Sequence, residues 1–162
     1  MNQVYILRGI PGAGKSTWAR HHAQDVHARR DTAVVSADHY FCHHGAYRFD
    51  PRELPQAHQA CFVAFIDYAM GRDEVSAIYV DNTNINAWEC SPYVLGGESY
   101  NWNVTIINFH VDPAIALARG VHGVPERVVY GMAEALDNTS LPPWWKQVHL
   151  KWDRNFNDYV PQ

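Results

Sequence analysis

Short runs of consecutive apolar residues alternate along the chain with longer segments in which apolar residues recur every three or four positions. The short runs are typical of buried strands, and the spaced pattern is typical of helices. The predicted strands are VYILR (4–8), TAVVS (32–36), AIYV (77–80) and VTIINF (104–109). Because strands and helices alternate and the strands are almost entirely apolar, we predict a parallel sheet with helices on both faces. The fold class is therefore α/β, with a sheet of four to five strands.

The predicted helices fill the segments between and after these strands. They run from Lys15 to about Arg30, over 56–71, from a possible cap at Asn86 to about Tyr100, briefly from Pro113, and from Pro125 to about Leu136. Prolines at the starts of the last two suit the first position of a helix. The segment between the second strand and Pro51 is predicted as a loop, and VHLKW (148–152) is a candidate fifth strand.

Composition supports a single globular domain over residues 1–162, because 47% of the residues are hydrophobic and 19% are charged. No apolar run approaches the roughly 20 residues of a membrane span, and the N-terminus lacks the pattern of a signal peptide. The three cysteines are widely spaced, which favours a reducing, cytoplasmic location. A net charge of −4 argues against a protein that coats duplex DNA, but not against an enzyme that grips a short stretch or an end.

Ligands of parallel α/β sheets bind beyond the carboxyl ends of the strands. This rule selects four places in the sequence, namely Gly9–Ser16, Asp38, Asp81, and His110 to Asp112.

The first of these places, GIPGAGKS, matches the phosphate-binding pattern G-x-x-x-x-G-K-[ST] between a predicted strand and a predicted helix. Glycines let the backbone wrap a phosphate, Lys15 can reach the outer phosphates, and the Ser16 hydroxyl can bind Mg²⁺. A chance glycine-rich turn is the alternative, and the strand–helix context argues against it. The residues predicted to hold ATP or another nucleoside triphosphate are Gly9, Pro11, Gly12, Ala13, Gly14, Lys15, Ser16 and Thr17.

Two acids end predicted strands close to this loop. Asp81 ends IYVD, where a carboxylate can steady Mg²⁺, although Asp81 or Asn82 could instead cap a turn or helix. Asp38 follows VVSA, where it can act as the general base for an acceptor hydroxyl, although an Asx-turn is the alternative. We therefore predict Ser16 and Asp81 as metal ligands and Asp38 as a catalytic residue.

Six segments occur in the order seen in P-loop kinases of the polynucleotide kinase family, and they look especially like the kinase modules related to NEDD4-binding protein 2. They are GIPGAGKSTWA, SADHYF, GAYRFDP, AHQA, VDNTNIN and VHGVPERV, within roughly residues 3–136. The resemblance implies a P-loop kinase fold and ATP-dependent phosphorylation of an alcohol group, usually the 5′-hydroxyl of DNA or RNA. It also implies that Lys15 and Ser16 hold ATP and Mg²⁺, that Asp38 activates the hydroxyl, and that Asp81 lies in the metal and acceptor region. The substrate-binding residues predicted on this basis are Asp38, Phe41, Arg48, Asp81, Thr83 and Asn84.

One position departs from the family pattern. Related phage kinases carry an arginine three residues after the catalytic acid, where it grips the substrate phosphate, and this chain has Phe41 there. Kinases of this kind also include enzymes that phosphorylate hydroxymethyl groups on DNA bases, so the acceptor stays open.

Two further segments carry candidate chemistry. Residues 118–129 resemble the lid of P-loop kinases, with Arg119 and Arg127 as catalytic candidates and His122 beside them, although both arginines could be exposed helix residues. The aromatic tail, 142–162, could stack the bases of a single strand, or its tryptophans could close the core.

The stretch SADHYFCHHG (36–45) also raises the possibility of zinc, because His39, Cys42, His43 and His44 follow Asp38. Structural zinc prefers two separated ligand pairs, for which only His58 and Cys61 offer a second pair. Three functions therefore stay open: a nucleic-acid kinase, which we favour, a kinase for a small molecule such as a nucleoside, sugar or drug, and a nucleotide-binding regulatory module without catalysis.

Overall fold

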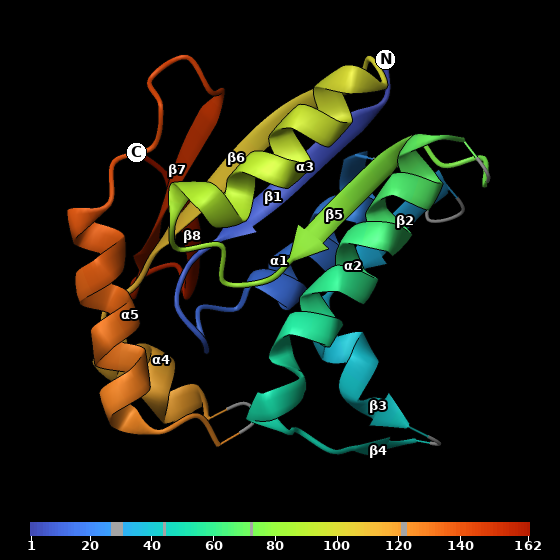
Figure 1. Ribbon diagram of the computed structural model, residues 1–162. Helices are drawn as coiled ribbons and strands as arrows, with labels where there is room; N and C mark the ends of the chain where they lie inside the picture. Colours follow the sequence, from blue (N-terminus) through green and yellow to red (C-terminus); the bar gives the residue numbers. More distant parts are fainter. Residues whose placement is uncertain (27–30, 44, 72, 121–122) are drawn as a thin grey trace.

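The computed structural model describes residues 1–26, 31–43, 45–71, 73–120 and 123–162 (Figure 1). Its centre is a six-stranded sheet in the order β2-β5-β1-β6-β7-β8. The strands are β1 (Gln3–Arg8), β2 (Thr32–Val35), β5 (Ala77–Asp81), β6 (Asn103–His110), β7 (Gln147–Asp153) and β8 (Asp158–Pro161). The first five strands in this order are parallel, and β8 pairs antiparallel with β7.

This sheet confirms the predicted α/β class and extends it. The candidate strand at 148–152 is present as β7, while β8 was not predicted. β8 is a short strand that returns beside β7 and contains Pro161, and such a strand is tolerated at the edge of a sheet.

In the described part of the chain, five α-helices connect and follow the strands. They are α1 (Lys15–Val26), α2 (Leu54–Ala69), α3 (Ala87–Ser99), α4 (Pro113–Arg119) and α5 (Glu126–Asn138). The start of α1 at Lys15 is as predicted, whereas its predicted extension over residues 27–30 lies outside the described residues. Asn86 caps α3 through a reciprocal capping box with Glu89, which explains why the helix begins there despite Pro92 in its interior. Among the described residues, no helix is both long enough and apolar enough to span a membrane.

The predicted loop between β2 and α2 holds more structure than expected. It contains the short 3₁₀ helices η2 (Ala37–Phe41) and η3 (Pro51–Glu53), with a small antiparallel hairpin of β3 (Cys42–His43) and β4 (Ala46–Tyr47) between them. Ser36 caps η2 by accepting a hydrogen bond from the amide of Asp38 at 3.2 Å.

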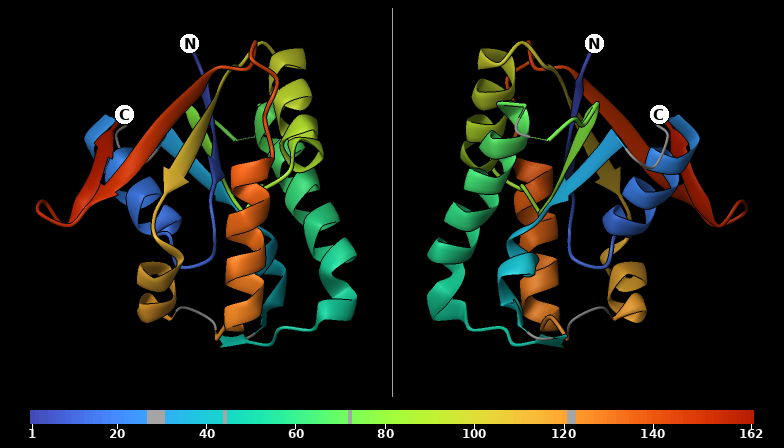
Figure 2. Two further views of the ribbon diagram at one scale, coloured as in Figure 1. Left: turned by 90° about the vertical axis from the view of Figure 1, so that its left-hand side faces the viewer. Right: turned by 90° about the vertical axis from the view of Figure 1, so that its right-hand side faces the viewer.

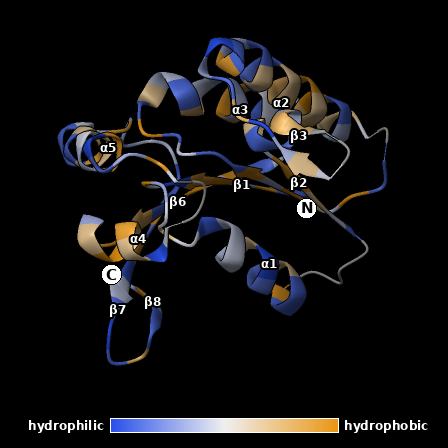
Figure 3. Cartoon of the chain, turned by 90° about the horizontal axis from the view of Figure 1, so that it is seen from below, coloured by the Kyte–Doolittle hydropathy of each residue, from blue (hydrophilic) through white to orange (hydrophobic). Residues whose placement is uncertain are grey.

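Helices cover both faces of the sheet, as predicted. The view along the sheet in Figure 3 shows α2 and α3 on one side and α1 and α4 on the other. Neighbouring residues of β1 follow this division, because Ile6 belongs to the core cluster under α2 and α3 while Leu7 belongs to the cluster that includes α1. The two views of Figure 2 show α5 beside the carboxyl ends of the central strands.

A buried arginine fastens this end of the sheet. Arg8, the last residue of β1, is 4% exposed and donates to the carbonyl oxygen of Ile85 at 2.7 and 3.0 Å, to Oδ1 of Asn108 at 3.0 Å, and to the carbonyl oxygen of Thr139 at 3.1 Å. It thereby ties β1 to the segment after β5, to β6 and to the end of α5. β1 leads directly into the loop Gly9–Ser16, and β6 and α5 line a cavity beside it.

Candidate active site

The loop Gly9–Ser16 leaves β1 at the carboxyl edge of the sheet and enters α1. Gly12 and Gly14 have φ angles of 78° and 85°, which side chains of L-residues rarely adopt. A Cβ at Gly12 would also lie 2.2 Å from the carbonyl oxygen of Ala116 in α4. The amides of the first turn of α1 have no partner within the helix and form a natural site for phosphate. The backbone of this loop therefore has the shape that its sequence pattern predicts.

Lys15 lies over this loop and is only 8% exposed. Its Nζ donates to the carbonyl oxygens of Gly9 and Ile10, both at 3.0 Å. Burial lowers the pKa of Lys15 to about 8, against the opposing effect of the negative charges of Asp81 and then Asp38. The ammonium group is thus close enough to both predicted acids to sense their charge, and it stays protonated at neutral pH.

Both acids lie in one cleft next to this loop. The cleft has a volume of about 590 Å³, and Ser16, Asp38 and Asp81 all line it. Its other lining residues come from α1, β2 and the segment up to β4: Ala19, Arg20, Ala23, Gln24, Thr32, Val34, Ser36, His39, Cys42 and Tyr47. The structure therefore brings together the predicted metal ligands and the predicted base, although Asp38 belongs to η2 and not to the end of β2 itself.

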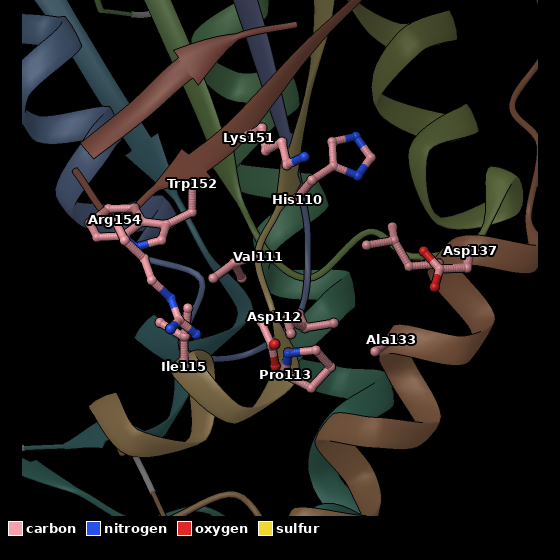
Figure 4. Close-up of a pocket in the computed structure, with 12 residues that line it drawn as sticks. His110, Val111, Asp112, Pro113, Ile115, Ala133, Asp137, Lys151, Trp152 and Arg154 are labelled. Atoms are coloured by element: carbon pink, nitrogen blue, oxygen red, sulfur yellow. The ribbon is translucent and has the colours of Figure 1, made fainter. Parts of the chain in front are cut away.

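A second cavity lies on the other side of the loop and is shown in Figure 4. It has a volume of about 350 Å³ and lies between the ends of β6 and β7 and the helices α4 and α5. His110 and Asp112, which the strand-end rule selected, line it together with Ile10 of the loop. Two basic side chains, those of Lys151 and Arg154, also line this cavity. The P-loop thus has a cavity on each side.

The two candidate lid arginines differ sharply. Arg119, at the end of α4, donates through Nη1 to the carbonyl oxygens of Gly12 at 3.3 Å and Ala13 at 3.2 Å. Arg127 is exposed in the first turn of α5 and makes no hydrogen bond to the P-loop among the described residues. Only Arg119 is therefore docked on the P-loop, and His122 lies outside the described residues.

Comparison with known proteins agrees with this geometry. A family described as AAA domain matches residues 4–128. The chain belongs to this AAA domain family. Human NEDD4-binding protein 2 is 32% identical to the chain over 139 residues, which is 81% of this chain. The chain spans only 7% of the length of that relative. The resemblance to P-loop kinase modules related to NEDD4-binding protein 2 is confirmed.

Solved structures place this AAA domain among P-loop kinase folds. A chain in the structure of the Pnkp1/Rnl/Hen1 RNA repair complex matches with a TM-score of 0.66 at 16% identity, covering 99% of this chain and 48% of that one. A gluconokinase from Sinorhizobium meliloti matches with a TM-score of 0.60 at 12% identity, covering 92% of this chain and 82% of that one. A sugar kinase from Janibacter matches with the same TM-score at 14% identity, covering 93% and 85%. At these identities the comparison shows a shared fold, and the predicted P-loop kinase fold is confirmed.

Two of the predicted acceptor contacts, Phe41 and Asn84, are buried in the fold. Phe41 is 1% exposed and belongs to the core, where its ring meets that of Phe49 edge-on at 5.1 Å. Asn84 is 2% exposed, has a positive φ of 47°, and donates through Nδ2 to the carbonyl oxygen of Leu7 at 2.7 Å. Both side chains are therefore packed in the interior, and neither is among the described residues that line the cleft.

Two more predicted acceptor contacts, Thr83 and Arg48, are not among the described residues that line the cleft with Asp38 and Asp81. The carbonyl oxygen of Thr83 accepts from the amide of Gly9 at 2.9 Å, so this residue ties the segment after β5 to the P-loop. Arg48 is exposed and is not among the described residues that line the cleft.

Sequence reasoning missed several residues of the site. Arg20 follows Ser16 by one turn of α1, so helical periodicity could have placed both in one cleft. Tyr47 donates its hydroxyl to Oδ1 of Asp38 at 3.1 Å, a contact across the β3–β4 hairpin that no local pattern signals. Burial first, and then the charge of Asp38, raise the pKa of Tyr47 to about 12, so its hydroxyl remains a donor. Asn82 bridges the site to the core by accepting from the amide of Ala37 at 2.9 Å and donating to Sγ of Cys61 at 3.4 Å.

The structure gives different environments to His58 and Cys61, the second ligand pair that a zinc site would need. Cys61 is 3% exposed and accepts from Asn82 and Tyr93 inside the core, whereas His58 is exposed. Among the described residues, no group of three or more His, Cys, Asp and Glu side chains could hold a metal ion. His44 lies outside the described residues.

Proposed function

We propose that this AAA domain is a kinase that transfers the γ-phosphate of ATP to a hydroxyl group of DNA or RNA, with Mg²⁺ as cofactor. The observation that carries the proposal is the convergence of Ser16, Asp38 and Asp81 on one cleft, beside the buried ammonium group of Lys15. Pure nucleotide binding needs the P-loop alone, whereas phosphoryl transfer also needs a base and a place for the acceptor.

The donor set fits Mg²⁺, since a hydroxyl oxygen from Ser16 and a carboxylate from Asp81 are ligands that this ion prefers. When bound there, Mg²⁺ would neutralise charge on the phosphates. Lys15 would leave the carbonyl oxygens that it contacts and bind the outer phosphates. Arg119 would add a second cation from α4, while Arg127 could approach only if residues 118–129 close as a lid.

Asp38 would accept the proton of the acceptor hydroxyl as its oxygen attacks the γ-phosphorus. One oxygen–phosphorus bond forms, the bond to the bridging oxygen breaks, and ADP leaves. The second cavity suits the nucleoside part of ATP, because it adjoins the P-loop at Ile10 on the side away from Asp38. Donor and acceptor would then approach the loop from opposite sides.

Arg20 is our candidate for the cation that holds the acceptor. Position 41 cannot serve, because Phe41 is in the core, whereas Arg20 and His39 line the cleft with Asp38. A guanidinium binds a phosphate diester through paired hydrogen bonds. The position of Arg20 is our argument for a nucleic-acid acceptor. It applies both to a 5′-hydroxyl and to a hydroxymethyl group on a DNA base.

The test is transfer of labelled phosphate from ATP with Mg²⁺ to a panel of acceptors: 5′-hydroxyl DNA and RNA oligonucleotides, DNA with hydroxymethylated pyrimidines, free nucleosides and sugars. We expect label in a nucleic acid, and we expect Asp38→Asn to bind ATP normally but to lose turnover. Label in free nucleosides or sugars alone would overturn the nucleic-acid acceptor in favour of a small-molecule kinase. Tight ATP binding without any transfer would indicate a regulatory module, and unchanged ATP affinity in Lys15→Ala would refute the nucleotide site.

A matched pair of variants tests the role of Arg20. Arg20→Gln should raise the KM for an oligonucleotide at least about tenfold while leaving the KM for ATP unchanged, because a charge-assisted hydrogen bond to phosphate is lost. Arg52→Gln is the control, since Arg52 is exposed outside the cleft and pairs with Asp50 at 2.7 Å. Equal effects of the two substitutions would remove Arg20 from the acceptor site.

The three cysteines are free, which supports the proposal that the protein works in the reducing cytoplasm.

A further inference from the structure

The last strands of the chain reach back to the P-loop. Tyr159 in β8 is half-buried, and its hydroxyl donates to the carbonyl oxygen of Ala13 at 2.6 Å, across 146 positions of sequence. Burial raises the pKa of Tyr159 to about 12, although the nearby charge of Arg119 opposes the rise. The hydroxyl is therefore protonated at neutral pH and serves as a hydrogen-bond donor to the loop.

The neighbouring strand β7 contacts Arg119 through Trp152. The guanidinium carbon of Arg119 lies 4.0 Å from the centre of the Trp152 ring, a distance typical of a cation–π contact. The same guanidinium donates to the carbonyl oxygens of Gly12 and Ala13. Arg119 is thus held between an aromatic face of β7 on one side and the P-loop backbone on the other.

The two aromatic residues support each other. Trp152 and Tyr159 are directly opposite in the β7–β8 pairing, and their rings meet edge-on with centroids 5.3 Å apart. Tyr159 also meets Phe109 of β6 edge-on at 5.0 Å, and a Cβ at Gly9 would lie only 3.0 Å from Cβ of Phe109. The β7–β8 hairpin therefore packs, through Phe109, near Gly9 at the start of the P-loop, and it is also hydrogen-bonded to Ala13.

We propose that the β7–β8 hairpin is a positioning element of the nucleotide site: Tyr159 fixes the P-loop backbone, and Trp152 holds Arg119 over the loop before a nucleotide binds. The nucleotide part of this proposal rests on the proposed function. An arginine that is already fixed loses less side-chain freedom on meeting a phosphate, and a loop that is already shaped needs no reorganisation. Arg119 covers one face of the Trp152 ring, so this face acts on the loop and is closed to stacking with a nucleic-acid base.

The first test uses the protein without nucleotide. Hydrogen exchange is followed by mass spectrometry in peptides that cover Gly9–Ser16, for the wild type, Tyr159→Phe and Trp152→Leu. Tyr159→Phe keeps the ring against Phe109 and removes only the hydroxyl, so P-loop exchange should rise about fivefold with the loss of one hydrogen bond. The controls are Tyr100→Phe and Trp144→Leu, whose side chains are 42% and 79% exposed. Wild-type exchange of the P-loop in both hairpin variants would overturn the proposal.

The second test measures ATP affinity and steady-state kinetics. Tyr159→Phe should weaken ATP binding about fivefold, and Trp152→Leu roughly three- to thirtyfold, with the KM for the acceptor unchanged. Trp152→Tyr should recover part of the loss, because it restores an aromatic face for Arg119. A purely structural hairpin would lower the melting temperature without this selective change in ATP affinity, and that result would refute the positioning role. If the wild type bound no nucleotide, the proposed function would fail, and the exchange experiment alone would decide whether the hairpin fixes the loop.

Discussion

Gly12→Ala should damage this protein far more than Gly14→Ala, although both glycines belong to the same loop and have similar φ angles of 78° and 85°. The shared backbone conformation should destabilise each alanine variant by roughly 1–2 kcal/mol. The surroundings differ, however. A Cβ at Gly14 would have Nη1 of Arg119 as its nearest neighbour at 3.5 Å, which is an ordinary contact.

At Gly12 the same atom would lie 2.2 Å from the carbonyl oxygen, 2.9 Å from the carbonyl carbon and 3.2 Å from the Cα of Ala116. These are backbone atoms of α4, which cannot rotate away, so the helix or the loop must move by about 1 Å. Forced overpacking of this kind adds about 1–3 kcal/mol. We therefore expect Gly12→Ala to be less stable than Gly14→Ala by about 2 kcal/mol, which for a chain of this size is about 6 °C in melting temperature.

Urea unfolding and thermal melting of both variants measure this difference, and Gly131→Ala serves as the control. Gly131 lies within α5, and among the described residues nothing beyond its own helix lies within 4 Å of the position that a Cβ would take. Alanine there should therefore stabilise the helix by about 1 kcal/mol. Equal stabilities of Gly12→Ala and Gly14→Ala would show that α4 does not press on the loop as the structure indicates. The same result would refute the close packing of Ala116 in α4 against Gly12 in the P-loop.

Two further predictions concern the walls of the two cavities. Tyr47→Phe removes the hydroxyl that donates to Asp38, so turnover should fall about fivefold while the KM for ATP stays constant; unchanged turnover would show that Tyr47 does not orient Asp38. Burial and then the charges of His149, Arg8 and Lys151 lower the pKa of His110 from 6.5, with Asp137 opposing them. Because the unfolded chain binds this proton more readily, the free energy of unfolding should decrease as the pH falls below about 6.5, by at most about 1.4 kcal/mol per pH unit for this site. His110→Asn should flatten that dependence in urea titrations between about pH 5.5 and 7.5, and an unaltered slope would exclude His110 as its source.

Local patterns predicted the elements of the fold well, because they depend on neighbouring residues. The apolar runs placed four of the five parallel strands and left the fifth, β7, as a candidate, and the motif between the first strand and the first helix placed the P-loop. The hairpin β3–β4 and the strand β8 escaped prediction, since Ala46–Tyr47 and Asp158–Pro161 are too short to show an alternating pattern. What stabilises them is pairing with another strand, which a local window does not contain.

The residues of the candidate site also differ in whether a local pattern of the sequence indicates them. Ser16, Asp38 and Asp81 could be predicted to lie together because each lies at or just beyond the carboxyl end of a parallel strand, or at the start of the first helix. The burial of Phe41 and Asn84 could not be predicted, because the direction of a side chain in a loop depends on tertiary packing. Tyr47 and Tyr159 were missed because their hydroxyls act on groups 9 and 146 positions away.

The P-loop motif therefore does not set its own shape alone. The carbonyl oxygen of Thr83 accepts from the amide of Gly9, and the backbone of Ala116 packs closely against Gly12. Arg119 donates to the carbonyl oxygens of Gly12 and Ala13, and Tyr159 also donates to that of Ala13. These contacts come from the segment after β5, from α4 and from β8, and α4 supplies two of them. A displacement of α4 must consequently move both the surface against Gly12 and the guanidinium over Ala13. Since α4 leads directly into the segment proposed as the lid, any closure of that segment would act on the phosphate-binding loop through contacts already present in this structure.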